Sequence, residues 1–295
     1  MSFHRVIVAF DGSERSADAL ALALRLLDPA GVLTLACVVP GPRWHVGAHV
    51  HHPDVPVPDE FAEMFTDARA TIPAGIRVRE RAPVAASAAR GLTELAESES
   101  ADLIVIGSSR HGDAGHIRLE RTAGRLLQGA PCAVAIAPGD LRETTDFRHV
   151  GIAFDDSPEA RAALAVAYGV AARCGAAVTL FSAVDLLDSD APAARRRVET
   201  ALDEAADGAP ARVNPRTVLL RGPAGTVIRD ACDGVVDLLV TGSRGYGPLQ
   251  RALAGSVSET LTEGAPHPVV VVPRPGSTTS RVITTSEGAR YDRVP

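Results

Sequence analysis

The chain has 295 residues, of which 46% are hydrophobic, so it can bury a large core, and its length predicts about two domains. The formal net charge of −6 and the absence of a basic block argue against nucleic acid or an anionic membrane as the main partner. The first residues enter a strand-like run at once, and no apolar segment approaches the roughly 18 residues of a membrane span, so we expect a cytoplasmic protein.

The basic and sulfur-containing residues exclude several kinds of site. All 30 basic residues are arginine, which rules out a P-loop lysine, a kinase strand lysine and Schiff-base catalysis. The cysteines stand far apart without a CxxC pair, so we expect small buried hydrophobic residues rather than disulfides or zinc ligands; they are Cys37, Cys132, Cys174 and Cys232. Any phosphate site in this chain must therefore work without lysine.

The chain contains two copies of one pattern. Three pairs of segments match along it: 3–27 with 147–171, 32–39 with 177–184, and 101–138 with 236–273. This repeat predicts one domain at residues 1–140 and a second at 147–275. The remaining residues, 276–295, carry turn and polar residues without an apolar period, so we expect a mobile tail.

In chain order, the first copy opens with a strand, and Ser13 then marks the start of a helix because serine is a preferred N-cap residue. Further along, four apolar residues fall at the i, i+3, i+4 and i+7 spacing of one helix face; they are Phe61, Met64, Phe65 and Ala68. A stripe of this kind is typical of a core face rather than of a cofactor contact.

The second copy alternates β-rich runs with amphipathic stretches. Strands are predicted at 150–154, 178–184, 217–220, 237–242 and 268–272, and helices at 159–175 and 191–209. Ser157 followed by Pro158 predicts a helix start, and Ser256 with Glu259 forms a capping box that would begin the last helix just after Gly255. This alternation predicts an α/β fold of two tandem doubly wound, Rossmann-like domains, each a five-stranded parallel sheet with helices on both faces.

The last apolar run of each copy is expected at a sheet edge. These runs are AVAIA at residues 133–137 and PVVVVP at residues 268–273. An apolar edge strand left open promotes aggregation. Each of these strands therefore needs a partner.

Three features of the second copy meet where an open parallel sheet binds its ligand, outside the carboxyl ends of the strands. Asp155 follows the first strand and can accept hydrogen bonds from ribose hydroxyls or an exocyclic amine. Ala183, near the end of the second strand, leaves room for a flat base, and Gly242 opens a loop whose amides can face phosphate. Gly255 and Ser256 would add amides and a hydroxyl at a helix N-terminus. Together these residues predict a nucleotide cradle.

The spacing of the loop separates it from commoner phosphate motifs. It is neither GxxxxGK[ST] nor GxGxxG, but Gly242, two residues, Gly245, nine residues, and Gly255 followed by Ser256. On this pattern the chain resembles a tandem universal stress protein, and the resemblance covers roughly residues 1–275. In that family the pattern G-2x-G-9x-G-[ST] accompanies ATP binding, so the resemblance implies ATP as the ligand, with or without Mg²⁺.

The resemblance also implies which residues contact ATP. It assigns the ribose and adenine to Asp155 and Ala183, the loop side to Gly242, Ser243, Arg244, Gly245 and Gly247, and the phosphates to Gly255, Ser256, Val257 and Ser258. It further implies that the last strands of the two copies pair across a pseudo-twofold within one chain, with dimerisation of the whole protein as a further step.

The first copy departs from the motif. Gly107 and Gly112 remain, but Arg110 replaces the second motif glycine, and Glu120 and Arg121 replace the Gly-Ser pair. A carboxylate repels a triphosphate, and the arginine side chain fills the space that glycine leaves. The main interpretation is an empty or differently filled cleft.

Part of the first cleft nevertheless survives. Asp11 and Val38 stand at its other end, so an adenosine moiety stays an alternative ligand there. His111 and His116 lie in the degenerate loop and are interpreted as polar surface rather than as catalytic residues.

A histidine-rich segment is found only in the first copy. Its metal-capable residues are His45, His49, His51, His52 and Asp54. They could ligate a transition metal, but the glycines and prolines around them favour a solvent-exposed loop without a dedicated metal.

The favoured function is that of a cytosolic ATP-binding stress-response regulator with an unknown protein partner. No residue of the motif is an evident general base, so we do not expect an enzyme. One alternative is a nucleotide-independent interaction protein in which both clefts are structural. A less favoured alternative is an enzyme of the adenine-nucleotide α-hydrolase-like group, because no substrate domain or catalytic cysteine setting accompanies the loop.

Overall fold

The computed structural model describes residues 2–41, 58–108, 115–141, 146–184, 191–243 and 257–274. The elements of the first half are β1 (Phe3–Ala9), α1 (Glu14–Leu26), β2 (Leu27–Ala36), β3 (Val39–Pro40), α2 (Asp59–Thr71), β4 (Arg77–Arg81), β5 (Val84–Ala85), α3 (Ala88–Glu99), β6 (Leu103–Gly107), α4 (Arg121–Gly129) and β7 (Ala133–Ala137). Those of the second half are β8 (His149–Ala153), α5 (Pro158–Cys174), β9 (Ala177–Val184), α6 (Ala191–Asp207), β10 (Pro215–Arg221), α7 (Ala224–Cys232), β11 (Leu238–Gly242), α8 (Val257–Thr262) and β12 (Val269–Val272).

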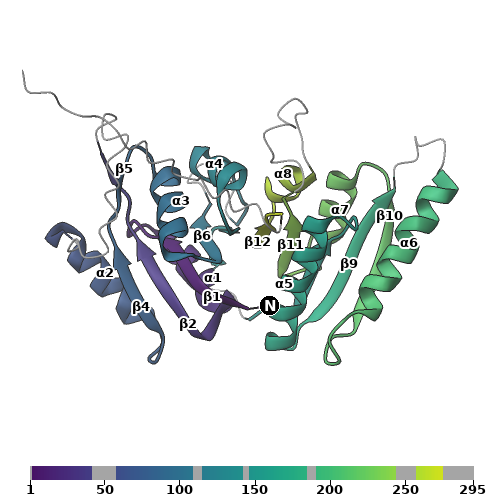
Figure 1. Cartoon of the computed structure of the whole chain (residues 1–295), viewed down its shortest axis with the longest axis horizontal. Helices are drawn as coiled ribbons and strands as arrows, with labels where there is room; N and C mark the ends of the chain where they lie inside the picture. The colour runs from purple at the N-terminus through teal and green to yellow at the C-terminus, as the bar shows by residue number, and fades with distance from the viewer. Residues whose placement is uncertain are drawn as a thin grey trace, which may run out of the picture.

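The main strands form one sheet that runs through both halves. Its order is β10-β9-β8-β11-β12-β7-β6-β1-β2-β4, with ten strands, and β3 and β5 form a separate two-stranded sheet. Strands within each half are parallel. Figure 1 shows the first half on the left and the second on the right, related by a pseudo-twofold. The predicted α/β class with two doubly wound halves is confirmed.

The two halves join through their last strands. β12 pairs antiparallel with β7, in the register Val269 with Ile136, Val270 with Ala135, and Val271 with Val134. The apolar runs expected at the sheet edges therefore cover each other within the chain, as predicted. Because the pairing is antiparallel, the two sets of strands run in opposite directions where they meet.

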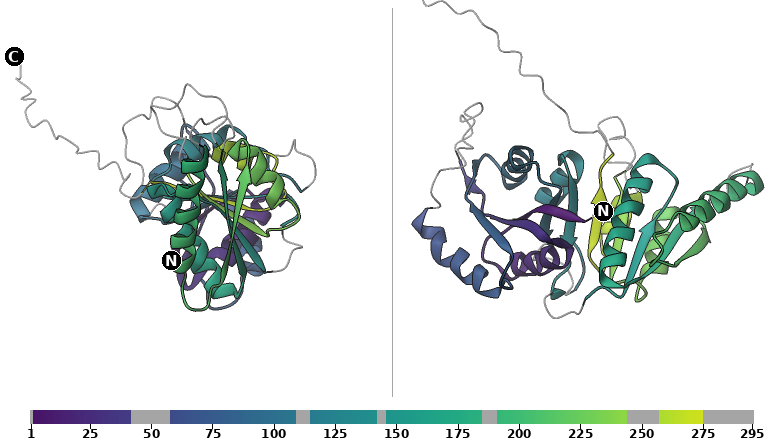
Figure 2. Two further views of the ribbon diagram at one scale, coloured as in Figure 1. Left: turned by 90° about the vertical axis from the view of Figure 1, so that its right-hand side faces the viewer. Right: turned by 60° about the horizontal axis from the view of Figure 1, so that its bottom comes forward.

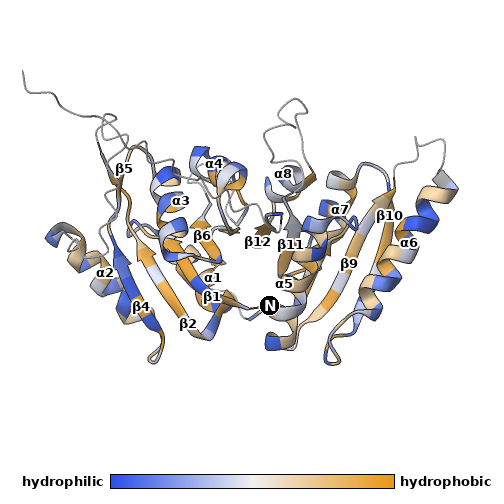
Figure 3. Cartoon of the chain, in the orientation of Figure 1, coloured by the Kyte–Doolittle hydropathy of each residue, from blue (hydrophilic) through white to orange (hydrophobic). Residues whose placement is uncertain are grey.

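Helices cover both faces of the sheet. One buried cluster packs α1, α2, α5 and α6 against one face, and a second packs α3, α4, α7 and α8 against the other. Figure 3 shows apolar residues along the strands and hydrophilic residues on the outer faces of the helices, and Figure 2 shows α6 at the outer end of the second half. No helix in the described ranges is long and apolar enough to cross a membrane.

The helix signals in the sequence act as predicted. The side chain of Ser13 accepts from the amide of Ser16 at the start of α1, and Ser157 accepts from Ala160 at the start of α5, with Pro158 as the first helical residue. The predicted core face of α2 is also confirmed, since Phe65 is 1% exposed. The capping box includes Ser256, which lies outside the described residues, and α8 begins at Val257.

Candidate functional site

The second half has an exposed carboxylate at the point where the strand order reverses. β8 lies between β9 and β11, and Asp155 follows its carboxyl end. Asp155 Oδ1 accepts from the backbone N of Ser157 at 3.1 Å and from Ser157 Oγ at 2.6 Å. The intervening Asp156 takes a positive φ of 61° and forms an ion pair with Arg161. The helix cap thus fixes an acceptor at the strand tip, where a ribose or base would lie.

The first half repeats this corner. Asp11 Oδ1 accepts from the backbone N of Ser13 at 3.1 Å and from Ser13 Oγ at 2.5 Å, and Gly12 takes the positive φ of 76°. Burial opposes ionisation of Asp11, but the hydrogen bonds from Ser13 outweigh it and hold the pKa of the carboxyl below its usual value. The first half therefore keeps a carboxylate acceptor at this strand tip.

The second strand differs between the halves in the size of one residue. In the first half Val38 packs over Gly91 of α3, where an added Cβ would lie 2.7 Å from Val38 Cγ1. In the second half the corresponding residues are Ala183 and Val227, both partly buried against the same cluster. The first half thus has a valine just beyond the strand and a glycine on the helix, whereas the second half has an alanine on the strand and a valine on the helix.

Gly242 has a packing role that the sequence did not reveal. A Cβ on Gly242 would lie 2.8 Å from the backbone carbon and Cβ of Glu159 and 3.0 Å from the backbone N of Ala160. Gly107 is its counterpart in the first half, and a Cβ added there would lie only 2.2 Å from Arg15 O. At this strand tip both halves need glycine so that the first helix can approach. Gly242 alone therefore does not distinguish a nucleotide site from a structural corner.

The residue after this glycine anchors the strand tip. The backbone N of Ser243 donates to Val272 O at 2.8 Å, as that of Ser108 does to Ala137 O at 2.8 Å. In the first half Ser108 Oγ also accepts from the backbone N of Arg118 at 2.7 Å. The side chain of Ser108 thereby fastens the returning part of the loop to the strand.

The degenerate loop of the first half docks on the second half. Ile117 is fully buried, its backbone N donates to Ala265 O at 2.8 Å, and its carbonyl accepts from Gly264 N at 2.8 Å. The backbone N of Leu119 donates to Glu263 Oε2 at 2.8 Å. His116 is exposed, as predicted. This segment therefore serves the contact between the halves.

The last helix of the second half presents its first residue to solvent. Val257 is 40% exposed, whereas Ser258 is 1% exposed and its carbonyl accepts from Thr262 Oγ1 at 2.6 Å. In the first half α4 begins at Arg121 after Glu120, whose side chain makes no capping hydrogen bond. Because Ser258 is buried, its predicted contact with phosphate would depend on its backbone amide.

A buried acid of the second half forms an unpredicted ion pair near the glycine loop. Glu159 lies in the first turn of α5 and is 6% exposed. Its Oε1 accepts from Arg274 Nε at 2.9 Å. The two residues are 115 positions apart in the sequence, and the only signal was the contrast with the first half, where Arg15 and Gly139 stand at the matching positions.

Several predicted residues lie outside the described residues. They are Arg244, Gly245, Gly247, Gly255 and Ser256 of the motif, Arg110, His111 and Gly112 of the first loop, and His45, His49, His51, His52 and Asp54 of the histidine segment. Among the residues that are described, no group of three or more metal-capable side chains is found. Of the predicted residues that are described, Asp155, Ala183, Gly242 and Ser243 lie at or just after the carboxyl ends of β8, β9 and β11, and Val257 is the first residue of α8.

The cysteines are free thiols. Cys132 and Cys232 are buried, and burial raises the pKa of both thiols to about 12. Cys37 and Cys174 are half-buried. Thiols that stay protonated at neutral pH are poor nucleophiles, so the two buried cysteines are core residues, as the sequence predicts.

Comparison of the sequence with models of known protein families identifies the family of this chain. The model of the universal stress protein family matches residues 2–138 and again residues 146–273. The chain belongs to the universal stress protein family. It carries two such domains in tandem, as the repeat and the resemblance predicted.

Universal stress proteins of known sequence are similar to this chain, and one crystal structure shares its fold. The universal stress protein Rv2005c of Mycobacterium tuberculosis is 31% identical over 186 residues, which cover 59% of this chain and 62% of that protein. A Thermus aquaticus universal stress protein is 31% identical over 135 residues, 43% of this chain and 98% of its own length. The crystal structure of a universal stress protein from Archaeoglobus fulgidus has a TM-score of 0.64 at 20% identity and covers 92% of this chain and 96% of its own.

Proposed function

We propose that this universal stress protein binds one ATP, in its second half, and acts as a cytoplasmic regulatory protein rather than as an enzyme. The observation that carries the proposal is the difference between two aligned loops. The second half keeps Gly245, Gly255 and Ser256, where the first half has Arg110, Glu120 and Arg121. Backbone amides without a Cβ can approach phosphate closely, and a helix N-terminus favours an anion.

The described geometry of the second half supports this proposal. Asp155 offers an exposed carboxylate at the switch point of the sheet, and Val257 at the start of α8 is 40% exposed. In the first half the corresponding loop is fastened by Ser108 and docked on the second half through Ile117. The second cleft is therefore the better candidate for a triphosphate.

A nucleotide-independent interaction protein is the second candidate function. Gly242 and Gly107 both have steric reasons to be glycine that involve no ligand. The partial burial of Ala183 against the core of the second half likewise needs none. This alternative predicts purified protein without nucleotide and no heat on addition of ATP.

Titration of the purified full chain with ATP separates the two functions, and we expect a stoichiometry near one. Gly245→Arg combined with Gly255→Glu places bulk and negative charge in the second loop, so ATP binding should be lost. The matched control is Gly124→Arg combined with Gly129→Glu, since both α4 glycines have open space where a Cβ would be added. A stoichiometry near two, or unchanged affinity in the loop variant, would contradict the proposal.

A further inference from the structure

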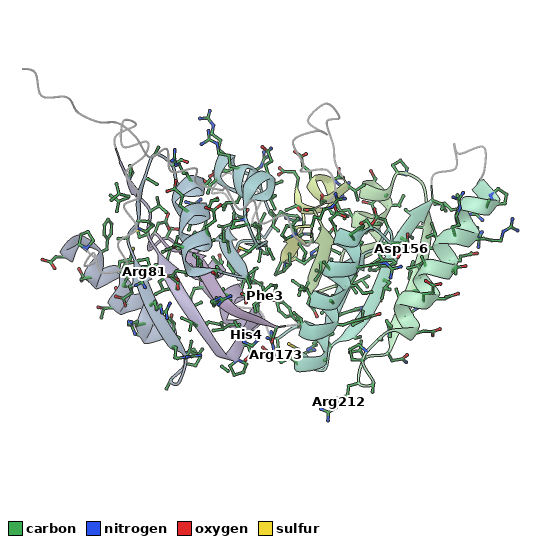
Figure 4. All side chains as sticks on the ribbon, in the orientation of Figure 1. Phe3, His4, Arg81, Asp156, Arg173 and Arg212 are labelled. Atoms are coloured by element: carbon green, nitrogen blue, oxygen red, sulfur yellow. The ribbon has the colours of Figure 1, made fainter. Side chains whose placement is uncertain are left out.

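The outer face of α6 carries charges of opposite sign toward its two ends. Exposed arginines lie in its amino-terminal half and exposed acids in its carboxyl-terminal half; they are Arg195, Arg196 and Arg197, and Asp203, Glu204 and Asp207. The other side of the helix packs on the sheet through the buried Leu202 and Ala205. Figure 4 shows nitrogen-bearing side chains near the upper end of α6 and oxygen-bearing ones farther down. The solvent-facing surface of this helix is therefore divided into a basic and an acidic part.

The acidic part opposes the stability of its own helix. Glu204 and Asp207 lie in the last turn, where the helix dipole disfavours negative charge. Asp203 and Asp207 are like-charged i,i+4 neighbours, which repel each other. In contrast α2, which occupies the same place in the first half, begins at Asp59 and has Arg69 in its last turn, in agreement with its dipole. Helix stability alone therefore does not explain the charges of α6.

Contacts within the chain leave most of these charges unused. Arg195 Nε pairs with Glu199 Oε1 at 2.7 Å, and Arg197 Nε donates to Ala193 O of the same helix at 3.4 Å. The other charged residues of this face form no ion pair with another residue of the described ranges; they are Arg196, Asp203, Glu204 and Asp207. Figure 1 shows α6 beside β9 and β10, at the end of the sheet farthest from β4. These exposed charges are available to a second molecule.

The order of the charges is self-complementary. With 3.6 residues per turn, Arg196, Thr200 and Asp203 follow one line along the helix, and Arg197 and Glu204 lie beside it. A second α6 can lie antiparallel to the first, with a twofold axis at Thr200. Arg196 then faces Glu204 of the second copy, Arg197 faces Asp203 of the second copy, and the symmetry repeats both pairs. Thr200 is exposed and small, so the two helices can approach each other at the axis.

We propose that α6 is a dimerisation surface whose partner is the α6 of a second copy of this chain, antiparallel to the first. A parallel arrangement would set arginines against arginines and acids against acids, so the charges select the antiparallel one. An isologous contact of this kind closes at two copies. A helix of 17 residues is about 25 Å long and gives a small interface, so the dimer is weak and depends on salt. The proposal is independent of ATP binding.

The first test is sedimentation velocity of the full chain over a range of protein concentrations. Wild-type protein should dimerise at low salt and dissociate at about 1 M salt, where the Debye length is only about 3 Å. Two charge reversals should each raise the Kd of the dimer about tenfold or more, because like charges then face each other. They are Arg196→Glu with Arg197→Glu, and Asp203→Arg with Glu204→Arg.

The matched control is Arg121→Glu with Arg125→Glu, which changes the net charge by the same amount as the arginine reversal on α6. Both residues are exposed on α4, so the Kd of the dimer should stay at the wild-type value. Thermal unfolding shows whether each variant is folded. Neither reversal on α6 should lower the unfolding temperature, because acids near the amino end and arginines near the carboxyl end agree with the helix dipole.

The decisive test mixes the two reversed variants. One presents acids and the other presents arginines at all four positions of the contact, so the 1:1 mixture should form a heterodimer at least as tight as the wild-type dimer. Charges that pair only within their own chain cannot produce this rescue. Wild-type protein that stays monomeric at low salt, particles larger than a dimer, reversed variants that dimerise as wild type does, or a mixture without heterodimers would overturn the proposal.

Discussion

At the scale of single residues, the strand-tip glycines show how packing and binding use the same residue type. Gly107 and Gly242 both lie where a Cβ would collide with the first turn of the first helix of their half, α1 or α5. Their presence in both halves follows from the close helix approach. Among the residues that we propose for phosphate binding, Gly245 and Gly255 distinguish the halves, because their counterparts in the first half are charged.

Gly107→Ala should therefore destabilise the protein although the first half lacks the phosphate motif. The new methyl group would meet the backbone of Arg15, which cannot move as a flexible side chain does. Overpacking of this kind lowers the free energy of unfolding by about 1 to 3 kcal/mol. Urea unfolding followed by circular dichroism measures the change. Gly124→Ala, with open space around the added methyl, should not destabilise, and equal stability of the two variants would contradict the steric account.

The site could be predicted from the sequence where short segments act alone. The exposed acceptor at Asp155 and the helix cap at Ser157 follow from local spacing, and the structure confirms both. The packing reason for Gly242 and the pairing of Glu159 with Arg274 could not be predicted, because each depends on residues brought together by the sheet.

At the scale of elements, one arginine joins the helices on either side of the seam. Arg173 near the end of α5 donates through Nη1 to Leu26 O at 3.0 Å and Leu27 O at 3.3 Å, and through Nη2 to Arg25 O. These carbonyls end α1, and the last carbonyls of a helix lack intrahelical donors. Figure 4 shows Arg173 beside the labelled residues of β1. The second half thus caps a helix of the first.

Arg173→Met should weaken the contact between the halves. It keeps much of the apolar stem and removes the donors to three carbonyls, so we expect a loss of about 1.5 to 3 kcal/mol in the free energy of unfolding. Arg195→Met is the control, because Arg195 forms an exposed i,i+4 pair with Glu199 on α6 and such pairs contribute at most about 1 kcal/mol. Guanidinium unfolding measures the free energy of unfolding of both variants. An equal loss in the two would show that the hydrogen bonds from Arg173 to α1 stabilise the protein no more than an exposed ion pair does.

Most elements could be predicted from periodicity. The strand expected at 150–154 is His149–Ala153, and the helix expected at 159–175 is Pro158–Cys174. The small β3 and β5 pair was not predicted, because two-residue strands have no measurable period and because Pro40 in β3 and Pro83 before β5 have no backbone N–H to donate. Its pairing comes from tertiary contact alone.

At the scale of the whole molecule, the apolar strands lie in the middle of the sheet and the polar ones at its outer edges. β7 and β12 are fully apolar and buried against each other. The outer strand β4 carries Arg77, Arg79, Glu80 and Arg81, and the other outer strand, β10, begins with Pro215. Charges and proline at an edge discourage addition of another strand. The pairing of β7 with β12 therefore covers, within one chain, the apolar edge strand that each domain alone would expose.

Each half produced as a separate protein should associate or aggregate through its uncovered last strand. Residues 1–141 produced alone would leave β7 open, and residues 146–274 would leave β12 open, so each half should form homodimers or aggregate. Produced together, they should form a 1:1 complex, measured by size-exclusion chromatography with light scattering. Val270→Asp should abolish this complex, because Val270 is fully buried opposite Ala135 and an unpaired charge there costs several kcal/mol.

The control for that substitution is Val235→Asp, which places the same charge at a residue that is 48% exposed. It should leave the complex intact, because the carboxylate stays hydrated. The decisive comparison is between the isolated halves and the mixture. Soluble monomers of either half would show that its last strand does not need a partner, and the antiparallel pair would then be a consequence of the linked chain rather than the contact that holds the two domains together.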